Sequence, residues 1–375
     1  MIIYLISAVF FIAVNIMLYI FKCSDKAKLS VNGVMLVIFS GLRSINIGTD
    51  VRNYGNIFNT FGRLPLSSDV SKSIDGFPVY RLMCKLIYVI FDGNYQVMLV
   101  VSAAIIIYGL FKFIYRYSDN CTASVFYYIT LFYFFIAWNI VRQSIAMSLF
   151  LLAFISFEEK KYVKCIILGL LASGIHSIAL IMFIAFVLTK IRWNKSIFAV
   201  YSLCIVLAMS LVPYMMNIFI RIFPRYAMYS NVLSGDISAF GGVAKGRKIV
   251  LSIIFLAFII LYFLINRSPV KAIENSENEL SEEKNVKDYF WLWASLTMIE
   301  IIIGILFSTN TFYGRLQILF SIYSIMLLPT IIERVGKKYR TIIYILTNIL
   351  FAATTVIRLL GNEADVYPYE FFWQV

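Results

Sequence analysis

Arg142 is the residue whose surroundings point most directly to chemistry. It lies in a short polar turn, Asn139 to Gln143, between two long apolar stretches that carry almost no charge. If those stretches cross a membrane, the arginine needs an anionic partner, and its planar guanidinium group matches the oxygens of a phosphate. The alternative is that the side chain reaches lipid headgroups, as arginines at helix ends commonly do. We favour a phosphate ligand at Arg142, with Gln143 beside it.

Two other groups are suited to proton transfer. His176, the only histidine, follows Gly174 at a break in an apolar stretch and titrates near neutral pH. Asp50 ends the sequence Gly48-Thr49-Asp50, four residues before Tyr54. Both also have structural interpretations, because a lone histidine is often a hydrogen-bonded structural residue and because Gly and Asp favour turns. Either group can act as a general base, and the sequence does not choose between them.

Arg43, Arg315 and Glu300 are further candidates. The two arginines lie near the ends of apolar stretches, where they either bind an anion or extend to headgroups. Glu300 lies within an apolar stretch, where a carboxylate is either functional or paired with a buried polar group. The five cysteines and the histidine lack the spacing of a metal site, and no phosphate-binding loop is present. We therefore expect neither a metal nor a cofactor.

Membrane helices must position these residues. Hydrophobic residues make up 61% of the chain and charged residues only 14%, and apolar runs near twenty residues long recur, which excludes a soluble domain. The net charge of +13 fits basic residues at helix ends rather than nucleic-acid binding. The sequence predicts an all-α polytopic membrane protein with about twelve crossings. The expected crossings are 2–21, 29–43, 95–115, 122–138, 143–157, 163–175, 177–189, 196–212, 249–266, 289–307, 316–332 and 340–358.

The distribution of basic residues predicts which side each loop faces. Lys and Arg concentrate in alternate loops, and the positive-inside rule makes those loops cytoplasmic. This pattern holds only if the stretch 163–189 crosses twice, with the break at His176. We predict outer loops at about 44–94 and 213–248, with short interfacial helices at Val79 to Phe91 and Met215 to Phe223. A polar inner loop at about 267–288 is expected to be a disordered connector, within one transmembrane domain spanning residues 1–375.

Motifs along essentially the whole chain resemble the EpsG family, which comprises Wzy-type polymerases of bacterial surface polysaccharide. The motifs are R-S-I-N-I-G-T-D-V-R-N-Y (Arg43 to Tyr54), N-I-V-R-Q-S-I-A (Asn139 to Ala146), E-E-K-K-Y-V-K followed by G-I-H-S-I-A-L (Glu158 to Leu180), F-Y-G-R-L (Phe312 to Leu316) and the terminal V-Y-P-Y-E-F-F-W. They are moderately specific and less so than a metal-binding signature.

The resemblance implies an enzyme that joins oligosaccharide repeat units carried on undecaprenyl diphosphate. It further implies an outward-facing active site in a helix bundle like the GT-C glycosyltransferases, in the bacterial cytoplasmic membrane. The expected partners are this lipid-linked oligosaccharide, membrane lipid and a chain-length regulator protein, and no nucleic acid. We expect Arg142, His176 and Asp50 to be catalytic and Arg43, Arg315, Gln143 and Tyr54 to bind the diphosphate substrate. The alternatives are a flippase of the same lipid-linked units and another GT-C enzyme such as a glycan ligase.

Overall fold

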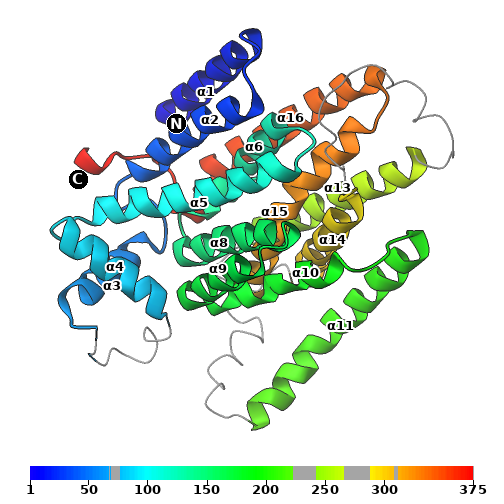
Figure 1. Cartoon of the computed structure of the whole chain (residues 1–375). Coiled ribbons are helices and arrows are strands. Elements are labelled where there is room, and N and C mark those ends of the chain that lie inside the picture. The colour runs from blue at the N-terminus through cyan, green and yellow to red at the C-terminus, as the bar shows by residue number, and fades with distance from the viewer. Residues whose placement is uncertain (67, 69–76, 223–241, 266–287, 308–310, 375) are drawn as a thin grey trace. The chain divides into compact units, whose positions relative to one another are not determined.

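The computed structural model of the chain is helical throughout its described part (Figure 1). It describes all residues except 67, 69–76, 223–241, 266–287, 308–310 and 375. Within this part, the extended backbone pairing is limited to an isolated bridge between Arg43 and Phe371. The prediction of an all-α protein is confirmed. The chain forms two compact units, one of residues 1–186 with 344–375 and the other of residues 187–343.

Most of the predicted site lies in the first unit. Its helices are α1 (Ile2–Ile20), α2 (Asp25–Gly41), α3 (Val51–Arg63), α4 (Pro78–Ile90), α5 (Tyr95–Tyr117), α6 (Cys121–Thr130), α7 (Tyr133–Ile136), α8 (Val141–Glu158), α9 (Tyr162–Ile175) and the 3₁₀ helix η1 (Ser177–Phe183). The second unit contains α11 (Lys195–Ile222), α13 (Gly242–Ile265), α14 (Phe290–Leu306) and α15 (Thr311–Glu333). Two helices, α10 (Ile184–Leu188) and α16 (Lys337–Leu360), run from one unit into the other.

Several of these helices are built to face lipid. Seven of the described helices are long and apolar enough to cross a membrane, so the chain is a multi-pass membrane protein. The apolar side chains of α1, including Ile2, Val9 and Ile20, are mostly exposed. Such a surface is unfavourable in water and favourable in a bilayer.

Short polar side chains cap the N-termini of several helices. The backbone N–H of Ala27 donates to Ser24 Oγ at the start of α2 over 3.3 Å. Asn94 and Asn120 cap α5 and α6 in the same way, with N–H to Oδ1 distances of 2.9 and 3.0 Å. These caps satisfy backbone donors that have no partner inside the helix.

The predicted crossing 122–138 is wrong as a continuous helix. It divides into α6 and α7 at Phe132, whose backbone is left-handed with a φ of 74°. The break frees the carbonyl groups of Thr130 and Leu131, and these accept hydrogen bonds from Thr355 Oγ1 at 2.6 Å and Arg358 Nη1 at 2.9 Å. Irregular backbone is tolerated in a membrane protein only where such partners replace the lost helical bonds.

The predicted break at His176 is present. Helix α9 ends at Ile175, and His176 has an extended backbone with φ −157° and ψ 113°. The stretch predicted to cross at 177–189 is the seven-residue 3₁₀ helix η1 followed by α10. Long 3₁₀ segments are uncommon and often mark functional positions.

The first loop predicted to face outward contains a helical hairpin made by α3 and α4, which pack side by side (Figure 1). The predicted helix at Val79 to Phe91 is present as α4. Its Arg81 Nη2 donates to the carbonyl of Pro65 at 2.8 Å, and its Lys85 Nζ donates to that of Gly62 at 2.6 Å. These basic side chains therefore hold the C-terminal end of α3, where carbonyl groups lack helical donors.

The described start of the second loop predicted to face outward continues the preceding helix. Helix α11 continues from Lys195 to Ile222, so Met215 begins no separate interfacial helix. The residue expected to end that helix, Phe223, lies outside the described residues. The predicted polar inner loop at about 267–288 also lies outside them, except for its last position.

Candidate functional site

Arg142 lies against three aromatic rings. It occupies the first turn of α8, and its guanidinium carbon is 4.4 Å from the ring centre of Phe77, 5.4 Å from that of Tyr54 and 5.6 Å from that of Tyr80. We call Tyr54, Phe77 and Tyr80 the aromatic box. Tyr54 comes from α3, and the other two come from the start of α4. Cation–π contacts with the three ring faces hold the guanidinium group in place.

Part of the guanidinium group lacks a hydrogen-bond acceptor in the described part of the chain. The buried Nε and Nη1 atoms of Arg142 have no hydrogen-bond partner among the described residues. Burying part of a cation without an acceptor is costly, and ring contacts offset only some of that cost. The side chain of Ile140, which precedes α8, makes no capping hydrogen bond, and the first turn contains no acidic residue. An unpaired guanidinium group at a helix N-terminus is an environment that favours an anion.

The structure brings His176 close to Phe77. The ring centres of His176 and Phe77 are 5.5 Å apart. The end of α9 approaches α4 closely, because a Cβ atom at Gly174 would lie 2.4 Å from Cγ2 of Val79. Glycine is therefore required at this contact, and it places the histidine beside the aromatic box.

The hydrogen bond of His176 indicates which ring nitrogen carries its proton. The backbone N–H of Ile178 donates to Nδ1 over 3.4 Å. A neutral imidazole whose Nδ1 accepts a hydrogen bond carries its proton on Nε2. In this tautomer Nε2 is a hydrogen-bond donor, which suits contact with an anion better than removal of a proton.

Cys84 and Tyr80 remain neutral beside the arginine. Burial raises the pKa of the Cys84 thiol to about 12, although a hydrogen bond from Tyr80 and the charge of Arg142 act in the opposite direction. Burial also keeps the pKa of the Tyr80 phenol well above its usual range. Since the thiolate is the nucleophilic form of cysteine, Cys84 is not a nucleophile at neutral pH.

Asp50 lies immediately before α3. Its side chain does not cap this helix, while its backbone carbonyl accepts from Tyr54 N at 3.0 Å. The aspartate is thus one helical turn from the tyrosine of the aromatic box. The preceding Gly48 has a φ of +107°, a conformation that side chains other than glycine rarely adopt. The Gly-Thr-Asp sequence is therefore a defined turn at the edge of the site.

Asn139 holds this turn, and the sequence analysis did not identify it as a site residue. Thr49 Oγ1 donates to Asn139 Oδ1 at 3.2 Å, and Asn139 Nδ2 donates to the carbonyl of Ala364 at 2.8 Å. Its position three residues before Arg142 in an otherwise apolar region was the available signal. Phe77 and Tyr80 were also missed, because aromatic residues in membrane proteins usually pack or line interfaces.

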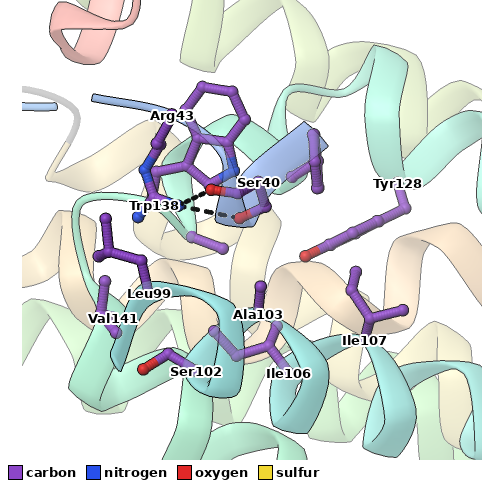
Figure 2. A pocket seen from close by; sticks show the side chains of 12 residues that line it. Ser40, Arg43, Leu99, Ser102, Ala103, Ile106, Ile107, Tyr128, Trp138 and Val141 are labelled. Carbon is purple, nitrogen blue, oxygen red and sulfur yellow. Dashed lines mark hydrogen bonds between the residues drawn. The ribbon is translucent and has the colours of Figure 1, made fainter. Parts of the chain in front are cut away.

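Arg43 has a different environment from Arg142. Figure 2 shows its guanidinium group bonded to Ser40 and beside Trp138. Nη1 donates to the carbonyl and, at 3.0 Å, to the hydroxyl of Ser40, and the guanidinium carbon is 5.2 Å from the centre of a Trp138 ring. The side chain is only 2% exposed. The adjoining cavity of about 10 Å³ has room for about one water molecule and none for a sugar.

The remaining predicted residues divide between the two units. Tyr54 is in the aromatic box, and the buried Gln143 follows Arg142 in α8. Arg315 in α15 is exposed, and Glu300 in α14 is buried. Both belong to the second unit, so their part in the site stays a prediction.

Comparison with known proteins gives a match to one family model. The EpsG family model matches residues 27–371, a range that includes the aromatic box, Arg142, His176 and nearly all of the C-terminal segment. No match was found among curated proteins or among solved structures.

Proposed function

Because this chain belongs to the EpsG family, we propose that it is a glycosyltransferase that polymerises oligosaccharide repeat units into bacterial surface polysaccharide, whether O-antigen, capsule or exopolysaccharide. The units are carried on undecaprenyl diphosphate, and the reaction takes place at the outer face of the cytoplasmic membrane. About twelve crossings in a GT-C-like bundle are part of the proposal.

The observation that carries this proposal is the unpaired guanidinium group of Arg142. It is fixed by three aromatic rings and has buried N–H groups with no acceptor among the described residues. A diphosphate supplies both the missing negative charge and the missing acceptor oxygens. Because the group is already positioned, little reorganisation is needed when negative charge develops on the leaving group.

The reaction is a substitution at an anomeric carbon. A hydroxyl oxygen of one lipid-linked unit forms a bond to the anomeric carbon of the growing glycan. The bond from that carbon to the diphosphate oxygen breaks, and its electron pair leaves with undecaprenyl diphosphate. The hydroxyl proton goes to a carboxylate or an imidazole of the enzyme, so charge and atoms balance without a redox partner.

We assign Asp50 as the proton acceptor and His176 as a donor to the diphosphate. The assignment is supported by the histidine Nδ1, which already accepts from the Ile178 N–H, and by the position of the aspartate one helical turn before Tyr54 of the aromatic box. A positioned base contributes a rate factor of about 10²–10⁴. Gln143 and Tyr54 border the diphosphate in this scheme, whereas roles for Arg43 and Arg315 stay predictions from the sequence.

The test uses the purified full-length protein and lipid-linked repeat units. Polymerisation gives a ladder of products on a gel, whereas a glycan ligase makes one attachment and a flippase makes no new glycosidic bond. In the bacterium that produces the protein, deletion of its gene should leave single repeat units at the surface. An unchanged ladder after deletion, or the absence of new bonds in the purified reaction, contradicts the proposal.

A further inference from the structure

The C-terminal segment of the chain lies against the turn that carries Asp50. We call residues 361–374 the C-terminal strap. Gly48 N donates to the carbonyl of Asp365 at 2.7 Å, Ser44 N to that of Glu370 at 2.8 Å, and Phe372 N to that of Leu42 at 3.0 Å. Three backbone hydrogen bonds thus join the strap to the stretch between α2 and α3.

Side chains of the strap are inserted into the first unit. Val366 is 0% exposed, and the phenol of Tyr369 donates to the carbonyl of Phe39 at 2.7 Å. The Tyr369 ring stacks on that of Phe39, with the ring centres 4.6 Å apart. Removing these apolar groups from water or polar headgroups favours attachment of the strap.

Asn139 connects the strap to the turn through a single amide group. The carbonyl of Ala364 can only accept, so the amide nitrogen must face the strap at 2.8 Å. The amide oxygen therefore faces Thr49, whose hydroxyl donates over 3.2 Å. At Gly48 a Cβ atom would lie 2.6 Å from the same oxygen, so the glycine lets the turn approach closely. Three chain segments meet at one side chain that must both donate and accept.

We infer that Asn139 is a positioning residue, which uses the C-terminal strap to hold the Asp50 turn in register with Arg142. This inference rests on the proposed function, because the position of Asp50 relative to Arg142 is given a role in the polymerase reaction. Asn139 lies three residues before Arg142 and bonds the residue next to Asp50. Displacing a positioned group by about 1 Å costs roughly 10²-fold in rate. The position of this amide therefore sets the catalytic rate without contact with substrate.

Two substitutions separate the two hydrogen bonds of the amide. Asn139→Asp keeps an acceptor for Thr49 but places a carboxylate oxygen against the carbonyl of Ala364. Thr49→Val removes the hydroxyl and leaves the bond to the strap intact. Both should lower kcat by about 10–10²-fold with KM within about twofold of wild type, because neither side chain binds substrate. Asn56→Asp, at an exposed position in α3, is the matched control and should leave kcat unchanged.

A labelling measurement reports how firmly the strap is attached and does not depend on catalytic activity. Val366→Cys, in full-length protein without the native cysteines, should react slowly with a maleimide because the side chain is buried. Adding Asn139→Asp should speed labelling at least about fivefold by loosening the strap, while Thr49→Val or Asn56→Asp should not.

The outcomes distinguish the inference from the proposed function. A wild-type protein that makes no polymer contradicts the proposed function. In that case the labelling rates alone test whether the Asn139 amide holds the C-terminal strap. Unchanged labelling in Asn139→Asp overturns the link between the amide and the strap. An unchanged kcat in both Asn139→Asp and Thr49→Val overturns the positioning role, as does a fall in protein amount with normal activity per molecule.

Discussion

The guanidinium carbon of Arg142 lies 4.4 Å from the ring centre of Phe77, the shortest of its three aromatic contacts. The ring of His176 lies near the same phenylalanine, with 5.5 Å between ring centres. Phe77 therefore lies close to both the guanidinium group and the imidazole of the candidate site.

Replacing Arg142 by lysine should abolish polymer formation almost as completely as replacing it by alanine. Lysine keeps the charge but cannot offer two parallel N–H groups to phosphate oxygens. Loss of one preorganised donor costs about 10²–10³-fold in kcat. The measurement is the chain-length distribution made by equal amounts of each purified variant. Near-normal polymer from Arg142→Lys would show that the arginine serves only the membrane interface.

Phe77→Leu should lower activity by about tenfold, because a cation–π contact of about 1 kcal/mol is lost and the guanidinium group becomes mobile. Phe77→Tyr keeps the ring and should retain most of the activity. Single-turnover rates of the two variants give the comparison. Equal rates for leucine and tyrosine would mean that Phe77 provides apolar volume only.

Asp50 and His176 should respond differently to amide substitutions. Asp50→Asn removes the proton acceptor, so kcat should fall by about 10²–10⁴-fold. His176→Gln keeps an N–H donor and should lose less activity than His176→Ala. If glutamine is as inactive as alanine while Asp50→Asn stays active, the histidine is the base and the roles are reversed.

Arg358 should be essential for the stability of the first unit. It forms a two-pronged ion pair with Glu363, with N–O distances of 2.6 and 3.0 Å, and also donates to the carbonyl of Leu131. Arg358→Ala leaves the largely buried carboxylate and carbonyl without this donor, which should cost about 3–5 kcal/mol in free energy of unfolding. Lys28→Ala breaks an ion pair in which Asp25 is exposed and should cost no more than about 1 kcal/mol. Equal melting temperatures of the two variants in detergent would contradict the prediction.

Single cysteines should report the sidedness of the chain. Positions 50 and 176 should react with an impermeant maleimide added outside the cell, whereas positions 160, 276 and 337 should react only after permeabilisation. The expectation follows from the excess of basic residues in the cytoplasmic loops. Outside labelling at position 276 would mean that the stretch 163–189 does not cross twice.

Residues with an unusual local sequence could be identified without the structure. Arg142 is a charge in an apolar region, and His176 follows a glycine at a break, so both were predicted and both lie beside Phe77. The helix at Val79 to Phe91 was also predictable, because its apolar run has an adequate length and begins at Pro78, a favoured first residue of a helix. The family resemblance came from the same local motifs and is confirmed by the family match.

Features that depend on distant partners could not be predicted. The break at Phe132 is compensated by Thr355 and Arg358, more than two hundred residues later. Asn139 looks like an ordinary turn residue until Ala364 is placed beside it. In the sequence Phe77 resembles the many other aromatic residues of the chain. It is distinguished only in the structure, where Arg142 of α8 and His176 at the end of α9 lie beside it.

The division of the chain into units has a consequence for its biosynthesis. The first unit combines residues 1–186 with residues 344–375, and the latter are synthesised after the whole second unit. The helix break at Phe132 and the turn before α3 therefore lack their hydrogen-bond partners while the whole second unit is inserted into the membrane. Until α16 is synthesised, the carbonyl groups of Thr130 and Leu131 lack their native donors. Synthesis that stops before residues 344–375 therefore leaves the first unit, and the Asp50 turn that the strap holds, incomplete.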